Sequence, residues 1–528
     1  MATKKEQIAQ EVAKAVGAGK VAMLETVDFN DPDRPKTCLE IDFPILSINK
    51  IATIEGKGSG ALKPIYQTSK WWARRRSNVF RSLLIAAATK APDDKSHSAK
   101  LVWNNYYANH QKKGAFKNLK VADIFMGGGT TLVEGARLGM QMVGNDLNPV
   151  AWFVVKQELA RVDPNEVKRL LAEVEAEVKP QIIPYYYCDG PNGEKGKWTH
   201  LPTSELKPAD FDPLSIPIDQ RQNYSYEGPE ILYTFWSKHR LCQVTGCDHR
   251  TPIMTSPVMA IKTCSVQYWE HNCKKCDREF HVEAASARLA PDAPLYVAPD
   301  EYPFSVLDQK KGVICPFCGN NSIINLGKGK KKKVELTLLV HPQWLAGSAK
   351  QDNKGQPFGG SAQDDPVSTA LWNEERAKTI RLLEVRGPLP AEVTCPLTGQ
   401  TFHSGKEGGT ATKTSSYTCS SCGTEQGMLD GIRKISKTAP VAGYATQCYS
   451  KQLDRSGVVL GGKFFSPFDR VFSHQYSMAC AEWESRKDTD LAEFWPKSKT
   501  LKGQESTRLL NHFYSNWWML FNPRHFLV

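Results

Sequence analysis

The chain has 528 residues, of which 41% are hydrophobic and 23% charged. This length and composition exclude a fibrous or wholly disordered protein and allow two to four packed domains. Lys and Arg number 68 against 56 Asp and Glu, so the formal net charge is +12. That balance favours a polyanionic partner such as nucleic acid, and an ordinary basic surface is an equal alternative.

The sequence contains no sign of a membrane or secretory segment. No run approaches the roughly 18 consecutive apolar residues of a spanning helix, and the first twenty residues lack the apolar core of a signal peptide. We therefore expect a cytoplasmic protein with no membrane contact. The fourteen cysteines fall mostly in one third of the chain, several in closely spaced pairs, which indicates zinc binding rather than a disulfide framework.

The predicted elements follow one another in a recognisable order. An amphipathic helix is expected around Ile8 to Leu24, and a second helix carries the apolar face Val79, Phe80, Leu83, Leu84 and Ala87 with a basic flank in WWARRRS. Next comes a β-α-β unit with a strand at 121–125, a helix at 130–138 and a strand ending near Asp146. The helix has a capping-box pattern, Thr131 with Glu134, and a further helix runs from Asp163-Pro164 to Pro180.

The turn of the β-α-β unit carries the most specific chemical signal. It reads Asp123-Ile-Phe-Met-Gly-Gly-Gly-Thr130, and small residues there let the backbone approach a ligand near the free N–H groups of a helix. Asp146, 23 positions after Asp123, can accept hydrogen bonds from both hydroxyls of a ribose. A nicotinamide-dependent oxidoreductase is disfavoured, because Thr131-Leu132 stand where the dinucleotide fingerprint requires its third glycine.

The pattern D-x-F-x-G-x-G-T with the later G-x-D-x-N-P resembles the S-adenosylmethionine site of amino-methylating DNA methyltransferases. Together with Ile65-Tyr66 and Trp71-Trp72-Ala73-Arg74-Arg75, it is similar to the zinc-ribbon-containing adenine-specific DNA methylases of bacteria and archaea, which often accompany phage-defence genes. The resemblance covers about residues 60–180 well. It departs from the family at Ile124, where proline is usual.

This resemblance implies a Rossmann-like methyltransferase fold of the α/β class that binds S-adenosylmethionine. Gly127, Gly128 and Gly129 would wrap the methionine portion, Asp146 would hold the ribose, and the segment before the turn would close over the cofactor. The expected cofactor-binding residues are Asp123, Phe125, Gly127, Gly128, Gly129, Thr130, Asp146, Asn148 and Trp72. The alternatives are a tight β-α connection without a ligand and tryptophans that merely fill the core.

The cysteine pairs predict one or two structural zinc ions. Cys273 and Cys276 form one knuckle and Cys315 and Cys318 another, the layout of a four-cysteine zinc ribbon with no open coordination position. A second zinc is expected from Cys242, Cys247, Cys419 and Cys422. Possible substitutes for these ligands are Cys395, Cys264, His249, His271, His281 and His403.

Basic residues near these motifs are candidates for contacts with DNA. We expect phosphate contacts from Arg74 and Arg75 and from Lys330, Lys331 and Lys332, which follow the second knuckle of the ribbon. A solvated loop is an equally good interpretation of the lysine run.

The sequence lacks the motif that methylates an exocyclic amine. Such enzymes use Asp or Asn, two prolines and an aromatic residue to accept hydrogen bonds from the amine and stack on the flipped base. This chain contains no Pro-Pro, and its nearest imitations are Ser466-Pro467-Phe468 and Asn522-Pro523-Arg524-His525-Phe526. No obvious strand-helix series follows Asp146, so the methyltransferase sheet looks incomplete.

We therefore expect a DNA amino-methyltransferase of a restriction-modification or phage-defence system, with adenine N6 as the favoured target. It would need a complementary catalytic chain or half and would be inactive alone, and defence-system proteins are possible partners. The alternative is a non-catalytic, zinc-ribbon, nucleic-acid-binding scaffold with a relict cofactor pocket. The expected divisions are an N-terminal segment at 1–62, the cofactor-binding part at 63–180, a connector at 181–240, the zinc-ribbon insertion at 241–430 and an aromatic-rich segment at 431–528.

Overall fold

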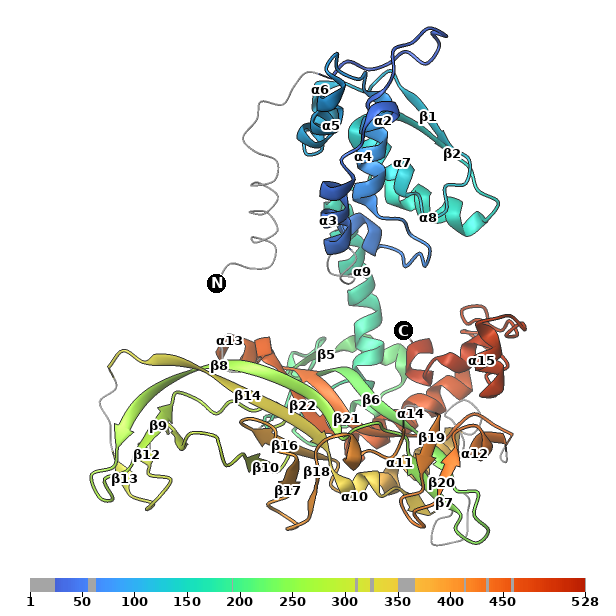
Figure 1. Ribbon diagram of the computed structural model, residues 1–528. Helices are drawn as coiled ribbons and strands as arrows, with labels where there is room; N and C mark the ends of the chain where they lie inside the picture. The colour runs from blue at the N-terminus through green and yellow to red at the C-terminus, as the bar shows by residue number, and fades with distance from the viewer. Residues whose placement is uncertain are drawn as a thin grey trace. The chain divides into compact units, whose positions relative to one another are not determined.

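The computed structural model describes residues 24–55, 63–191, 193–308, 312–322, 327–349, 366–412, 415–433, 436–456 and 460–527. The protein is a mixed α/β structure that divides into two compact units, Met1–Lys168 and Arg169–Val528 (Figure 1). The expected helix around Ile8 to Leu24 lies almost wholly outside the described residues, and the five expected divisions remain a prediction. None of the described helices combines the length and the apolar composition that crossing a membrane requires.

The first unit consists of helices around a small parallel sheet. Its elements are α2 (Cys38–Ile41), α3 (Ile45–Glu55), α4 (Ser77–Ala88), α5 (Ser98–Asn105), α6 (His110–Lys113), β1 (Lys120–Asp123), α7 (Thr130–Leu138), β2 (Gln141–Gly144) and α8 (Pro149–Leu159), with 3-10 helices at Pro64–Gln67 and Lys95–His97. Helix α9 (Pro164–Ile182) begins in this unit and continues past its boundary. Ile85, Val102, Phe116 and Leu138 belong to the core that joins α4, α5 and α7.

The β-α-β unit has the predicted order and nearly the predicted bounds. β1 and β2 pair in parallel from Lys120 opposite Gln141 to Asp123 opposite Gly144, and α7 connects them. The capping-box prediction is wrong, because the N-cap of α7 is Gly129 in a left-handed conformation and no side chain caps it. The predicted basic helix also starts later than expected, since Trp71 to Arg76 precede α4.

The second unit is built mainly from strands. They are β3 (Lys197–His200), β4 (Glu205–Leu206), β5 (Tyr224–Glu227), β6 (Glu230–Leu241), β7 (His249–Pro252), β8 (Val258–Asn272), β9 (Glu279–Glu283), β10 (Leu295–Val297), β11 (Phe304–Val306), β12 (Val313–Ile314), β13 (Asn321–Ser322), β14 (Lys330–Val340), β15 (Ser348–Ala349), β16 (Leu382–Arg386), β17 (Glu392–Thr394), β18 (Thr401–His403), β19 (Ser416–Thr418), β20 (Glu425–Gly427), β21 (Val441–Tyr449) and β22 (Lys463–Pro467). Its helices are α10 (Pro342–Leu345), α11 (Pro366–Arg376), α12 (Asp430–Arg433), α13 (Lys451–Ser456), α14 (Arg470–Arg486) and α15 (Ser506–Asn511).

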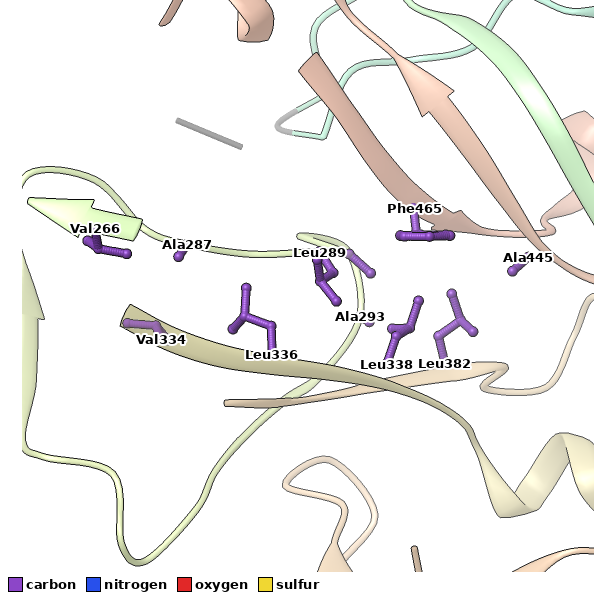
Figure 2. Packing of buried hydrophobic residues seen from close by; sticks show 11 residues of the cluster. Val266, Ala287, Leu289, Ala293, Val334, Leu336, Leu338, Leu382, Ala445 and Phe465 are labelled. Atoms are coloured by element: carbon purple, nitrogen blue, oxygen red, sulfur yellow. The ribbon is translucent and has the colours of Figure 1, made fainter. Parts of the chain in front are cut away.

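Two larger sheets form the body of this unit. One has the strand order β10-β16-β14-β8-β9-β11 and the other the order β15-β7-β6-β21-β22. Leu336 and Leu338 of β14 pack with Leu289 and with Phe465 of the second sheet, so one core cluster joins the two sheets (Figure 2). Strands β8 and β14 form a long, curved antiparallel ribbon that reaches away from this core (Figure 1).

The aromatic residues of the C-terminal segment pack against one another, as the sequence predicts. Trp483 of α14 stacks on Phe526 with ring centroids 4.5 Å apart, and Trp495 meets the edge of Trp518 at 5.7 Å. The last residues form a 3-10 helix at Pro523–Phe526, whose Asn522 side chain accepts a hydrogen bond from the N–H of Arg524. These contacts hold the parts of the segment against one another.

Candidate cofactor and metal sites

The glycine turn is a closely packed loop between β1 and α7. Gly127 and Gly129 have φ angles of 49° and 72°, a region that strongly favours glycine. The N–H of Gly129 donates to Met126 O at 2.7 Å, and the N–H of Met126 donates to Asn145 O at 3.0 Å. The turn is therefore tied to the end of β2, which is where Asp146 lies.

Asp146 links the glycine turn to the segment that follows β2. Its Oδ2 accepts a hydrogen bond from the N–H of Gly127 at 2.8 Å, and its Oδ1 accepts one from the N–H of Asn148 at 2.8 Å. These backbone donors, Asn148 first and Gly127 second, lower the pKa of Asp146, so it is ionised at neutral pH. A carboxylate has about four lone-pair sites, and two of them remain for further donors such as ribose hydroxyls.

The other predicted cofactor residues surround this turn with different exposures. Phe125 is 79% exposed next to the turn, and Thr130 is buried at the start of α7. Asp123 accepts the N–H of Phe125 at 3.2 Å, and Asn148 caps α8 by accepting the N–H of Val150 at 2.9 Å. The structure thus places Asp123, Phe125 and Thr130 in or beside the turn, whereas Asn148 has a clear role in starting a helix.

Trp71 lies against the glycines, and the contact of Trp72 with the cofactor stays a prediction. A Cβ added to Gly128 would come within 2.7 Å of Cγ of Trp71, so only glycine fits beneath this indole. Trp72 is 86% exposed, and Nζ of Lys70 lies 3.9 Å from its ring centroid. The sequence contains both tryptophans, but nothing in their immediate neighbours indicates which one faces the turn.

Arg74 is buried beside the turn and hydrogen-bonds to it, so its charge does not face solvent. Its Nη1 donates to Gly128 O at 2.6 Å and its Nη2 to Oε1 of Glu158 on α8 at 2.6 Å. Both side chains are buried, and the guanidinium carbon lies 4.8 Å from the ring centroid of Tyr66. This placement departs from the expected phosphate contact, while Arg75 is exposed as that expectation requires.

A second buried acid, Glu134 of α7, holds the segment before the turn. Lys63 Nζ and Tyr66 Oη donate to its Oε1 at 2.7 and 2.8 Å, and Arg137 Nη1 approaches the same oxygen at 3.2 Å. Sequence reasoning assigned Glu134 to a cap and missed Glu158. The sequence did contain a signal for a buried acid: Glu158 falls on the same face of its helix as the apolar residues Ala151 and Val155.

The structure brings the eight predicted zinc ligands together in two separate clusters. Cys273, Cys276, Cys315 and Cys318 form one, Cys242, Cys247, Cys419 and Cys422 the other, and within each the four Sγ atoms lie within 4.8 Å of one another. The described part of the chain offers no third group of three or more potential ligands, so the substitute ligands considered above are not needed.

The sulfur geometry of both clusters suits tetrahedral zinc. Sγ–Sγ distances are 3.6 Å for Cys273 and Cys318 and 3.7 Å for Cys242 and Cys422. A tetrahedron with Zn–S bonds of about 2.3 Å has edges of about 3.8 Å, whereas a disulfide needs about 2.05 Å. Each donor set can therefore hold one zinc ion through four thiolates, a closed arrangement that stabilises structure and leaves no position for catalytic water.

One thiol in each cluster is prepared for ionisation. The backbone N–H groups of Cys276 and Lys275 lower the pKa of Cys273 to about 6. The hydroxyl and N–H of Thr424 lower the pKa of Cys422 to about 6. Because the thiolate is the form that binds metal, these hydrogen bonds favour zinc binding at neutral pH.

The lysine run forms the start of β14 instead of a solvated loop. Lys330 Nζ lies 2.8 Å from Oε2 of Glu270, and Lys332 Nζ lies 2.9 Å from the buried Glu283. Lys331 points to the other face of the strand, where it is exposed. Of the three lysines predicted to contact phosphates, Lys330 and Lys332 are paired with acids, and Lys331 has no ion pair with a described residue.

Neither imitation of the methyl-transfer motif is arranged for catalysis. Phe468 is fully buried in the core that α14 covers, so it cannot stack on a base. In the second imitation Arg524 is buried, and its Nη1 donates to Tyr185 O at 3.1 Å. Both segments serve packing.

Comparison with known proteins gives one informative likeness. The type II methyltransferase M.MvaI of Kocuria varians is 33% identical to this chain over 67 residues, which is 13% of this chain and 15% of that protein. The chain thus matches about a seventh of the length of this relative. No family model and no solved structure matches the chain. The likeness supports a relationship to methyltransferases.

Proposed function

We propose that this chain is the cofactor-binding and zinc-bearing part of an S-adenosylmethionine-dependent DNA amino-methyltransferase. The observation that carries the proposal is the glycine turn between β1 and α7, which Asp146 meets with an ionised carboxylate from the end of β2. The likeness to a type II methyltransferase supports the same reaction class. Adenine N6 as the target and a restriction-modification or phage-defence setting follow from the family resemblance.

The residues present fit S-adenosylmethionine. Asp146 keeps acceptor sites for the ribose, and the exposed Phe125 offers an aromatic face beside the turn. Trp71 and Arg74 hold the glycines in their conformation, the indole from one side and the guanidinium through Gly128 O. When bound, the cofactor supplies an activated methyl group, and these residues position it.

The sheet of the first unit is too small to be a complete methyltransferase domain. Among the described strands, β1 and β2 pair only with each other. Parallel sheets are normally covered on both faces, yet six large apolar side chains in or next to this one are exposed, namely Ile124, Val143, Leu147, Val150, Trp152 and Phe153. In our proposal a complementary catalytic segment adds strands here and supplies the missing Asp-Pro-Pro-Tyr-like motif.

Calorimetric titration with S-adenosylmethionine tests the cofactor site. The full, zinc-loaded chain should release heat with one binding event, and Asp146→Ala should abolish it because the ribose acceptor is lost. Asp189→Ala, an exposed acid of the second unit, is the matched control and should bind normally. Binding that survives Asp146→Ala unchanged, or no binding by the unaltered chain, would contradict the proposal.

Addition of a segment that carries the missing motif tests the catalytic part. The two polypeptides together should transfer methyl groups to DNA, and digestion to nucleosides should reveal N6-methyladenine. The lack of a methyl-transfer motif in this chain favours a second candidate, a nucleic-acid-binding scaffold. Such a scaffold would bind DNA, would release no heat when titrated with S-adenosylmethionine, and would stay inactive with every complementary segment.

A further inference from the structure

The ribbon of β8 and β14 has a central stretch that is only two strands wide. β9 pairs with β8 only over Tyr268 to Asn272, and β16 pairs with β14 only over Leu336 to Val340. Between these regions, Thr263 to Gln267 face Lys331 to Glu335, and no other described strand pairs with them. Only the two ends have a further backbone hydrogen bond, from the N–H of Ala284 to Gln267 O and from the N–H of Gly387 to Glu335 O. This stretch is a narrow antiparallel β-ribbon.

The two faces of the ribbon differ sharply. Val266 and Val334 are buried on one face, and farther along β14 Leu336 points toward Leu289 on the same side (Figure 2). The opposite face carries alternate residues of both strands, and every one of them is exposed: Thr263, Ser265, Gln267, Lys331, Lys333 and Glu335. The core therefore fixes which side chains reach solvent.

The exposed face carries two lysines and one acid, Glu335, so its net charge is positive. Lys331 and Lys333 have no ion pair with any described residue, whereas Lys330 and Lys332, which belong to the buried face, are paired with Glu270 and Glu283. The ribbon leads directly to the zinc cluster, since Cys273 follows β8. The surface near that cluster adds further exposed cations, Lys274, Lys275, Arg278 and Lys328.

We infer that the exposed face of this ribbon is a binding surface for double-stranded DNA that enters the major groove. The choice of DNA as the polyanion rests on the proposed function. The major groove is about 12 Å wide and admits a two-stranded β-ribbon, whose strands lie about 4.8 Å apart. Lys331 and Lys333 contact phosphates, while Gln267 and Ser265 present hydrogen-bonding groups to base edges. The zinc cluster holds the end of the ribbon and brings its own cations to the flanking phosphates.

Fluorescence anisotropy with a labelled 25-base-pair duplex, measured over a series of NaCl concentrations, tests this surface. Each phosphate contact contributes about 0.9 to the slope of log affinity against log salt. Lys331→Gln with Lys333→Gln should therefore lower the slope by about 2 and weaken binding about 30-fold at 0.15 M salt. Gln267→Ala should leave the slope unchanged and reduce discrimination between duplex sequences by about 5- to 150-fold.

Two matched controls separate this surface from general charge. Lys330→Gln removes a charge from the neighbouring residue on the buried face, and Lys499→Gln with Lys502→Gln removes two exposed charges from the C-terminal segment. Both should bind as the unaltered chain does. Retained zinc content and circular dichroism show that the ribbon variant is folded.

Three outcomes would overturn the inference: an unchanged salt slope in the ribbon variant, an equal loss in the controls, or preference for single strands over duplex. The cofactor proposal is tested separately, because the ribbon variant should keep its heat of S-adenosylmethionine binding. If duplex binding depends on Lys331 and Lys333 while the cofactor does not bind, the DNA surface stands and the proposed methyltransferase function fails.

Discussion

Gly129→Ala is the sharpest test of how the glycine turn is held. Alanine at the φ angle of 72° costs about 1–2 kcal/mol, because its Cβ crowds the following carbonyl in the left-handed conformation. The added Cβ would also lie 2.4 Å from Cγ2 of Val155 on α8, and such overpacking costs about 1–3 kcal/mol. We therefore expect a loss of about 2–5 kcal/mol in the stability of the first unit.

Two further variants separate these contributions. Gly114→Ala has a similar φ angle of 64°, but its Cβ would meet only the flexible Lys117 side chain at 3.5 Å, so it should show the backbone cost alone. Val155→Ala removes both methyl groups that collide with the Cβ added at Gly129. By itself it should cost about 2–3 kcal/mol for the lost burial. Combined with Gly129→Ala, it should cost about 1–3 kcal/mol less than the sum of the two.

Hydrogen–deuterium exchange over a urea series, read from peptides of α7 and α8 in the full chain, measures these free energies for the first unit alone. Additive effects of Gly129→Ala and Val155→Ala, within about 0.5 kcal/mol, would refute the steric reasoning. An equal cost for the changes at Gly129 and Gly114 would refute it as well, since only Gly129 faces Val155.

Three other predictions follow from the same geometry. Glu158→Gln leaves the Arg74 guanidinium buried without an acid, so exchange in α8 should report a loss of about 3–5 kcal/mol, and a loss below about 1 kcal/mol would show that the brace is unimportant. Elemental analysis should find two zinc ions per chain, and Cys276→Ser should leave one; two ions in that variant would rule out Cys276 as a ligand. The pKa of Asp146 is depressed in the folded state, so its stabilising effect is present above the ordinary pKa of an aspartate and is lost as the pH falls through the depressed value. The protection factor of the Gly127 amide, which compares its exchange rate with that of an unstructured amide at the same pH, should therefore fall on acidification, and Asp146→Asn should remove this fall.

The buried ion pairs show where sequence reasoning stops. Arg74 is one of three consecutive arginines, and a run of charges normally indicates a solvated surface. Its role depends on Glu158, 84 residues away in sequence, which lies on the same face of α8 as buried apolar residues. Only the packing of α8 against the turn makes that partnership possible.

The lysine run shows the same limit in a simpler form. In the sequence, the four consecutive lysines at 330–333 do not show which side chains point toward the core and which toward solvent. Once they form a strand, their side chains alternate: Lys330 pairs with the exposed Glu270 and Lys332 with the buried Glu283 on one face, while Lys331 and Lys333 reach solvent on the other. Pairing of β14 with β8 therefore decides which of them can contact DNA.

The sequence by itself determined the features that depend on close neighbours along the chain. The glycine turn with its flanking strands, the helix at 130–138 and the cysteine knuckles at Cys273–Cys276 and Cys315–Cys318 all follow from local periodicity, glycine conformation and ligand spacing. The cysteine composition also predicted the second set, Cys242 and Cys247 with Cys419 and Cys422, which the structure brings together. Only the tertiary structure decided that Trp71 covers the glycines and that Arg74 pairs with Glu158. The physical reason is that a backbone conformation is set within a few residues, whereas the partner of an indole or a buried charge is set by which elements pack together.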